Sequence, residues 1–399
     1  MAFPTLCPLR YPLKNSEEPD YLYIKDTFSC TSSKQNSAVL TSSFGMREYD
    51  ENGQNIKYDA IGSLTANIWD DFEIASVVPQ EIKVESSASI STIAFAKHKL
   101  TQQKVVIKAF TEYDDYTDIY PDNLIFEIKA YQKIKHLTSV VPLFGRYVNH
   151  YVYPNEWSGV KCLNCIGIDD NALQDEDYKK LLAQMHDVAT NAVLSLGINP
   201  GDIRRSNHTH YFLVTEYLPG VSLKKFVIQP PDENVIESIL FQLLFALHVM
   251  FNMGFQHNDL HDGNIIVDTN PACKSAIFYI NGQMYDVPTP VKIIIYDFDF
   301  ASCSQCGPNE SLGLWCKSFG ICNERNSKFD LYTIFRFLSE KLDVRIDNIL
   351  TSSLGPILTE RIKNRFYSPF FKEGGPHTVK LPVEIIEKHF KNYVIPRKK

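Results

Sequence analysis

Residues 257–264, read His257-Asn258-Asp259-Leu260-His261-Asp262-Gly263-Asn264, lie where a long amphipathic segment ends and a short apolar one begins. They offer a carboxylate, Asp259, and a carboxamide, Asn264. A further carboxylate, Asp297, follows the apolar stretch 292–296, and a buried acid is costly unless it binds a metal or a partner. Phosphoryl transfer needs such oxygens for Mg²⁺ and a carboxylate aimed at the incoming hydroxyl. The pattern favours this chemistry over the alternative that these residues only cap loops.

The flanking segments predict an α+β fold. Short strands are expected at 82–85, 92–96 and 104–108, then a helix at 123–137 and one or two strands within 140–152. A strand at 211–217 runs into the turn 218–220, which could serve as a hinge. Residues 233–252 carry the apolar spacing of a core-facing helix, and strands are expected at 265–267 and 291–296. The last part, from about 327, reads as mostly helical.

Three regions follow from this order. Residues 1–78 lack sustained periodicity and are predicted to be an irregular N-terminal extension. Residues 79–217 form a small β-rich part with one main helix, interrupted by an insertion at about 154–208 that has helical spacing at 177–196. Residues 218–399 form the larger α-helical part.

Over about residues 80–340 the chain resembles the protein-kinase superfamily, through H-x-D-x-x-x-x-N followed by Asp297-Phe298. The resemblance implies a two-lobed fold that binds ATP. It makes Asp259 the catalytic base or substrate-orienting group, and Asn264 and Asp297 the ligands of Mg²⁺ or Mn²⁺. It also makes Lys108 the phosphate-binding lysine and Glu127 its ion-pair partner. Three further positions match an internal packing spine: Tyr131, His257 and Phe298.

Finer features resemble the haspin branch of these kinases. His261 stands where most protein kinases have lysine, and a long link containing 278–282 precedes Asp297. Phe329-Asp330-Leu331-Tyr332 follows without an Ala-Pro-Glu triplet, so that Asp330 resembles the buried helix aspartate that braces the catalytic loop. The composition, rich in Ile, Asn, Lys, Tyr and Phe, would suit a viral or protist member.

The nucleotide site departs from the family's pattern. Ser86-Ser87-Ala88-Ser89-Ile90-Ser91 stands where the family has a glycine-rich loop, whose glycines let the backbone approach phosphates. Small side chains avoid a steric block, and serine hydroxyls can donate to phosphate. By resemblance the nucleotide contacts are Ser86, Ser87, Ala88, Ser89, Ser91, Ile93, Lys108, Thr215, Glu216 and Leu218.

Two substitutions bear on regulation. Asn258 replaces the arginine that normally pairs with a phosphorylated activation loop, so activation by loop phosphorylation is not expected. Asp299 replaces the glycine of Asp-Phe-Gly, and a non-glycine residue tolerates positive φ poorly, so flipping of this loop should be restricted.

Two Cys-x-x-Cys pairs occur, at 162–165 and 303–306. Four thiolates can bind Zn²⁺, here Cys303, Cys306, Cys316 and Cys322. Their spacing is not a clean double Cys-x-x-Cys pattern, so ordinary reduced cysteines are the favoured interpretation.

The composition limits the classes of partner and the location that can be expected. The 399 residues carry a formal charge of −7, which disfavours a general nucleic-acid binder. Neither a membrane-spanning segment nor a signal peptide is expected, so the protein is predicted to be soluble and intracellular. Nothing indicates an oligomeric state.

Three functions remain open. The leading hypothesis is a Ser/Thr protein kinase with a protein substrate. A small-molecule kinase of the aminoglycoside or choline phosphotransferase type also uses H-x-D-L-H-x-G-N. A pseudokinase scaffold is favoured only by the missing glycines.

Overall fold

The computed structural model describes residues 44–56, 61, 63–78, 91–113, 123–135, 137–139, 141–155, 175–195, 208–229, 231–303, 306–309, 312, 329–339, 348–349 and 380–396. Contacts divide the chain into two units. The sheet unit comprises the described parts of Tyr58–Gln132 and Arg146–Tyr217. The helical unit comprises those of Met1–Lys57, Lys133–Gly145 and Leu218–Lys399. The sheet unit is rich in strand and the helical unit is rich in helix, which agrees with the predicted α+β fold class.

The sheet unit is built on five antiparallel strands in the order β2-β3-β4-β6-β5. Their bounds are Phe72–Val77, Thr92–His98, Lys104–Tyr113, His208–Glu216 and Tyr147–Asn155 in that order. Strand β3 alternates between buried and more exposed side chains, as a sheet with two unlike faces requires. The strands predicted at 92–96 and 104–108 are β3 and β4.

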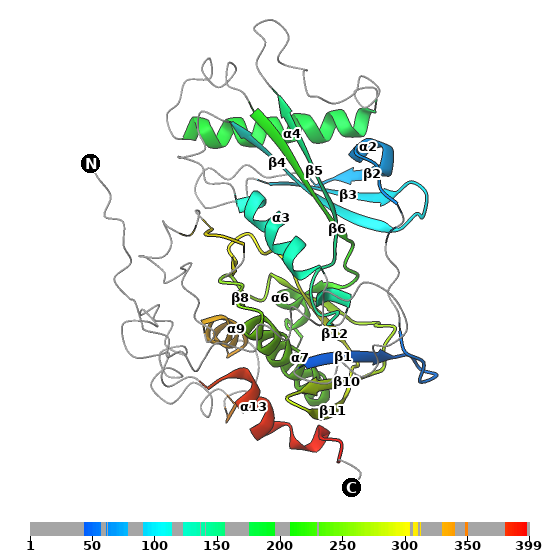
Figure 1. The fold of residues 1–399 in the computed structure, drawn as a ribbon, viewed down its shortest axis with the longest axis vertical. Coiled ribbons are helices and arrows are strands. Elements are labelled where there is room, and N and C mark those ends of the chain that lie inside the picture. Colours follow the sequence, from blue (N-terminus) through cyan, green and yellow to red (C-terminus); the bar gives the residue numbers. More distant parts are fainter. Residues whose placement is uncertain are drawn as a thin grey trace, which may run out of the picture. The chain divides into compact units, whose positions relative to one another are not determined.

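One face of this sheet is covered by helix α4 (Glu176–Ser195), which contacts β2, β3 and β4 (Figure 1). Its buried residues Leu181 and Met185 join Phe72, Ala94 and Ile107 in one apolar core. The predicted helix at 177–196 is therefore α4, and this part of the insertion at 154–208 forms a packing layer of the sheet unit. Helix α3 (Asn123–Ile134) carries Glu127 against β4.

The predicted irregular extension at 1–78 differs from the structure in its described part. It contains strand β1 (Phe44–Tyr49), the short helix α2 (Ile68–Asp71) and strand β2. The strand predicted at 82–85 lies outside the described residues. Short strands such as β1 lack a local signature, because a partner distant in sequence supplies their hydrogen bonds.

Helix α7 (Glu233–Asn252) is the centre of the helical unit. It is long and apolar enough to cross a membrane, but 78% of that window is buried within the protein, as expected of a core helix. Gln242 accepts the N–H of Ile293 and donates to the carbonyl of Val291, which ties α7 to strand β12 (Lys292–Ile295). The sheet β12-β9-β7 adds Ile265–Asp268 and Val221–Ser222. The remaining elements are α6 (Leu223–Phe226), β8 (Phe255–Gln256), β13 (Ser302–Cys303), α9 (Phe329–Ser339), α13 (Pro382–His389) and two 3-10 turns, η3 (Leu137–Ser139) and η5 (Lys391–Tyr393).

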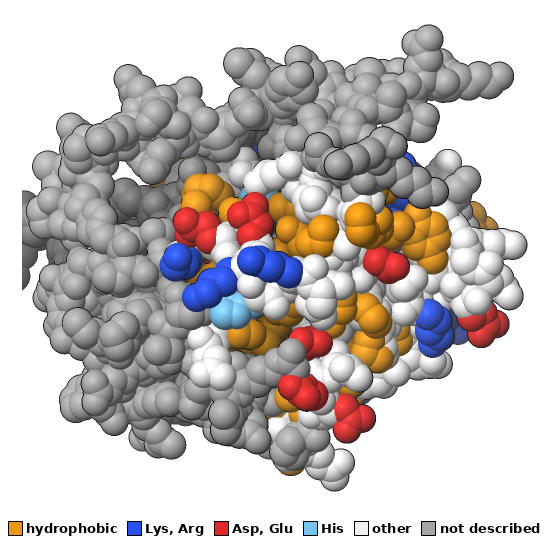
Figure 2. Space-filling model, turned by 90° about the horizontal axis from the view of Figure 1, so that it is seen from below, with side chains coloured by type: hydrophobic (Ala, Val, Ile, Leu, Met, Phe, Trp, Pro, Cys, Tyr) orange, Lys and Arg blue, Asp and Glu red, His pale blue; other side chains and the backbone are white. Residues whose placement is uncertain are grey.

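The long link before Asp297 forms a β-hairpin, β10 (Ser275–Ile280) and β11 (Gln283–Pro288). Strand β1 pairs with β10, and near the C-terminal end Val394 bridges to Tyr285 of β11. Phe241 of α7 packs on Phe278, with ring centroids 4.9 Å apart. The hairpin therefore joins segments from both ends of the described chain to the core helix. Figure 2 shows one face of the molecule on which acidic, basic and apolar side chains are interspersed.

Candidate active site

Residues 257–264, the predicted catalytic loop, connect β8 to β9 and are held by a buried acid of helix α9. Asp330 accepts the backbone N–H of His257 at 2.7 Å and that of Asn258 at 2.8 Å. Burial raises the pKa of Asp330, while the His257 imidazole and these two hydrogen bonds oppose the rise. Two charge-assisted bonds to a buried carboxylate fix the backbone that leads into Asp259. Asp330 thus lies where the family resemblance places the bracing aspartate.

Asp259 and Asn264 come together within this loop. The Asn264 amide donates to the backbone carbonyl of Asp259 at 3.0 Å and faces its carboxylate Oδ2 at 3.4 Å. Because Nδ2 is engaged in this way, Oδ1 of Asn264 is the atom that can bind a cation. Burial raises the pKa of Asp259; the imidazoles of His261 and His257 oppose this, and Asp297 adds to it. Negative charge from Asp297 therefore reaches Asp259.

Asp297 follows β12 at the turn into residues 298–300. Its φ is 68°, a left-handed conformation that Asp and Asn adopt more readily than most residues. Asp299, which replaces the family's glycine, is not among the described residues with positive φ, so the strained position is Asp297 itself. The Tyr296 hydroxyl donates to the Gly263 carbonyl at 2.8 Å, and His257 Nε2 donates to the Tyr296 carbonyl at 2.9 Å. These bonds tie the end of β12 to the catalytic loop.

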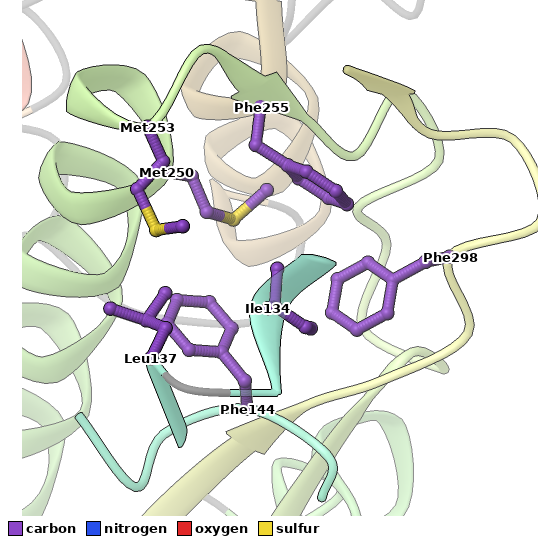
Figure 3. A pocket seen from close by; sticks show the side chains of 7 residues that line it. All are labelled: Ile134, Leu137, Phe144, Met250, Met253, Phe255 and Phe298. Atoms are coloured by element: carbon purple, nitrogen blue, oxygen red, sulfur yellow. The ribbon is translucent and has the colours of Figure 1, made fainter. Parts of the chain in front are cut away.

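Phe298 points into the core of the helical unit. Its ring is fully buried and lies 5.2 Å from that of His257 and 5.4 Å from that of Phe255. It lines an apolar pocket (Figure 3). The other lining residues are Ile134, Leu137, Phe144, Met250, Met253 and Phe255. Two of the three predicted spine residues therefore pack together, and the third, Tyr131, is buried in the sheet unit.

Asn258 is buried. It stands where the kinase family has an arginine that pairs with a phosphorylated activation loop. It adopts φ 66° and donates from Nδ2 to the Phe300 carbonyl at 2.9 Å, while its Oδ1 accepts from Gln256. A second amide, Asn309, donates to the carbonyls of Asp299 and Ala301 at 2.8 and 3.0 Å. Together with the pairing of β13 and β8, these amides fix the chain after Asp297.

Sequence reasoning did not find Asn309 or Gln256. Gln256 directly precedes the motif, and Asn309 follows it at a distance. Only the folded chain shows that their buried amides bond to the catalytic loop and to the segment after Asp297.

The lysine and glutamate of the sheet unit form an ion pair. Lys108 Nζ lies 2.7 Å from Glu127 Oε2, with side-chain exposures of 13% and 2%. Strand β4 places Lys108 opposite Ile93 of β3 and Leu213 of β6. A cation on one face of a sheet, steadied by a buried acid, can bind phosphate oxygens.

The predicted nucleotide contacts are described only in part. Ser86, Ser87, Ala88 and Ser89 lie outside the described residues, while Ser91 is buried just before β3. Thr215 and Glu216 end strand β6, and Leu218 begins the next segment of the helical unit. The Glu216 carboxylate is held by Arg146 at 3.1 Å and Gln103 at 3.1 Å. The side chain of Glu216 therefore has structural partners, and its backbone N–H donates to the Arg146 carbonyl at 2.9 Å.

The cysteine pairs give no metal site in the described structure. Cys303 is buried and Cys306 half-buried, and no disulfide joins them. Among the described residues no group of three His, Cys, Asp or Glu side chains is placed to hold a metal ion. Cys162, Cys165, Cys316 and Cys322 lie outside those residues, so the structure does not test the less favoured zinc site. The amide oxygen of Asn264 and the carboxylate of Asp297 are oxygens of the kind that Mg²⁺ takes, since it binds one or two protein oxygens together with substrate phosphates.

Part of the chain is similar to a known family of domains. Residues 177–303, which include the catalytic loop and Asp297, match the model of the ABC1 atypical kinase-like domain. The chain carries a protein-kinase-like domain. Lys108 and Glu127 lie outside the matched part of the kinase-like domain, so their assignment depends on the ion pair.

Individual relatives match only short segments of this chain. Human Citron Rho-interacting kinase is 40% identical over 62 residues, 15% of this chain and 3% of that protein. Serine/threonine-protein kinase 1 of African swine fever virus (isolate Pig/Kenya/KEN-50/1950) is 33% identical over 75 residues, 17% of this chain and 25% of that protein. The chain therefore spans a quarter or less of these two relatives. A crystal structure of the Rad53 kinase domain and SCD2 aligns with a TM-score of 0.38 and 14% identity, covering 81% of this chain and 89% of that one.

Proposed function

We propose that this protein is an ATP-dependent serine/threonine protein kinase that transfers the γ-phosphoryl group to a protein hydroxyl. The observation that carries the proposal is the contact of Asn264 with Asp259 in a loop braced by Asp330. A pseudokinase has no need for a base and a cation-binding amide held side by side. The matching ion pair of Lys108 and Glu127 supports the same conclusion.

Each residue has a role in the proposal. Asp259 accepts the proton of the acceptor hydroxyl and orients its oxygen toward phosphorus. Lys108 contacts ATP phosphate oxygens, and Glu127 holds the lysine in place. Asn264 Oδ1 and the Asp297 carboxylate would hold Mg²⁺, which when bound neutralises charge that develops on the phosphate oxygens. The raised pKa of Asp259 suits a base that must take up a proton near neutral pH.

A protein acceptor is favoured by the similarity to two proteins named as kinases, one of them a serine/threonine-protein kinase. The match to the ABC1 atypical kinase-like domain keeps a small-molecule acceptor as the second candidate. The resemblance to the haspin branch and a viral or protist origin belong to the proposal as well. So does an intracellular location.

Independence from activation-loop phosphorylation is also proposed. The buried amide of Asn258 donates to the Phe300 carbonyl at 2.9 Å, in the place of an arginine that would need a phosphate partner. Asn309 adds bonds to the neighbouring carbonyls. Internal amides then fix the segment after Asp297, as a phosphate–arginine pair fixes an activation loop in other kinases. Amides carry no charge that requires neutralisation.

The test is transfer of radiolabelled phosphate from ATP to a panel of proteins and Ser/Thr peptides, run beside amino sugars and small alcohols. Asp259→Ala should lower the rate by about 10²–10⁴-fold. Lys108→Ala should also abolish most transfer. The exposed residues Asp286 and Lys129 provide the matched controls, and Asp286→Ala and Lys129→Ala should keep the rate. Labelling of small molecules alone would move the assignment to the second candidate. Nucleotide binding without any transfer would indicate a pseudokinase.

Phosphorylation independence has its own measurement. Protein produced in bacteria and treated with phosphatase should keep its full rate. A fall in rate on phosphatase treatment, reversed by rephosphorylation, would contradict this part of the proposal.

A further inference from the structure

The imidazole of His261 is held in the catalytic loop by close contacts. The backbone N–H of Gly263 donates to Nδ1 at 2.9 Å, and the ring of Phe337 lies edge-on with its centroid 5.8 Å away. Gly263 also leaves the space that the ring occupies. A Cβ at residue 263 would lie 2.5 Å from His261 Cε1 and 2.8 Å from Nδ1. A side chain at residue 263 would therefore displace the imidazole from this position, whereas the backbone angle at Gly263 does not itself call for glycine.

This contact selects one tautomer of the ring. A backbone N–H is always a donor, so Nδ1 must accept and the neutral imidazole carries its hydrogen on Nε2. Nε2 faces Oδ2 of Asp259 at 3.6 Å. The Asn264 amide approaches the same oxygen at 3.4 Å. Two N–H donors therefore converge on one carboxylate oxygen.

We propose that His261 is a positioning residue for Asp259: the Nε2–H group, locked by Gly263, holds Oδ2 so that Oδ1 accepts the proton of the acceptor hydroxyl. This inference rests on the proposed phosphotransferase function. Both donor contacts are longer than a normal hydrogen bond, and such contacts tighten when a substrate binds. Side-chain exposures of 35% for His261 and 38% for Asp259 leave the pair open to an acceptor.

A competing account makes His261 a packing residue for Phe337. The two accounts predict different results when the imidazole is replaced by a ring without nitrogen atoms. His261→Phe keeps an aromatic ring against Phe337 but removes the donor. His261→Gln keeps an N–H donor at a similar distance from the backbone but removes the ring. Gly263→Ala keeps His261 and displaces its imidazole.

Kinetics on the full chain decide between the accounts. His261→Phe should lower kcat by about 10–100-fold, as loss of an orienting partner does, and leave the KM for ATP within about threefold. His261→Gln should recover part of the rate, and Gly263→Ala should resemble His261→Phe. His389→Phe, on helix α13 away from the loop, is the matched control. A His261→Phe protein with unchanged kcat, or with a change only in KM, overturns the inference.

The tautomer of His261 can be measured without an activity assay. Nitrogen NMR of histidine-labelled protein, recorded on the neutral imidazole and assigned with His261→Phe, should find the hydrogen of His261 on Nε2, and a mixture of tautomers in Gly263→Ala. A hydrogen on Nδ1 overturns the inference. Failure of the proposed function appears differently, as a wild-type protein that transfers no phosphate although its His261 carries the Nε2 hydrogen.

Discussion

Glu48 of strand β1 and Lys292 of strand β12 form a buried ion pair, with Lys292 Nζ 2.9 Å from Glu48 Oε1. Lys292 begins the strand that ends just before Asp297, so the pair ties the N-terminal strand to the strand that delivers a proposed metal ligand. A buried charge that loses its partner remains unsolvated. Lys292→Met or Glu48→Gln alone should therefore lower the free energy of unfolding by about 3–5 kcal/mol.

The double variant Glu48→Leu with Lys292→Met is the control for this pair, because it removes both charges. It should recover most of the loss in urea denaturation, since an apolar replacement of a buried pair is often neutral or stabilising. Equal losses in the single and double variants would show that the pair has no such role.

Asp330→Asn should weaken the catalytic loop. The amide replaces one acceptor oxygen by an NH₂ group that faces the backbone N–H of His257 or Asn258. A buried donor left without an acceptor costs about 1–3 kcal/mol, so the free energy of unfolding in urea denaturation should fall by that amount, and kcat should fall as well. An Asp330→Asn protein with wild-type stability and kcat would refute the bracing role.

Gly220→Ala should destabilise the helical unit. Gly220 adopts φ 123°, and a Cβ there would lie 2.2 Å from the Val267 carbonyl oxygen in strand β9. Since backbone atoms line the contact, no side chain can move aside, and alanine at this positive φ should lower the free energy of unfolding by more than about 1 kcal/mol. Gly53→Ala is the comparison, because that glycine also has positive φ (74°) but nothing within 4 Å of an added Cβ. Equal losses in urea denaturation would contradict the steric account.

Acid should destabilise the sheet unit through His210. Burial, and then the neighbouring His208 and His186, lower the pKa of His210 to about 3, and Nδ1 contacts the Thr111 hydroxyl at 2.8 Å. The unfolded chain, with an ordinary histidine pKa near 6.5, binds the proton first as pH falls. The contribution of neutral His210 to the free energy of unfolding is therefore fully present above pH 6.5. It is lost as the pH falls toward 3, by up to about 1.4 kcal/mol per pH unit.

Urea denaturation between pH 7.5 and 5 measures this slope, with His210→Asn as the variant that keeps a polar partner for Thr111. His248 of α7, with a pKa lowered to about 4 by burial, acts in the same direction and stays in both proteins. The variant should have a smaller pH dependence than the wild type. Identical slopes would mean that His210 does not titrate as inferred.

The sequence alone identified the elements with strong local patterns. Helices α4 and α7 and strands β9 and β12 were predicted because apolar spacing and chain length define such segments without reference to partners. The catalytic loop was found because its chemistry requires particular residue types at short spacing. The roles given to Asp259, Asn264 and Asp297 remain proposals for the experiments above.

Only the tertiary structure decided which distant residues meet. Strand β1 was missed because its hydrogen bonds come from β10, more than two hundred residues later in the chain. No local pattern in the sequence shows that Glu48 reaches Lys292, or that Asn309 caps the carbonyls of 299 and 301. His261 and Gly263 were both visible in the motif, but their coupling is steric. It depends on how a ring fills the space left by a missing Cβ, and that space exists only in the folded loop.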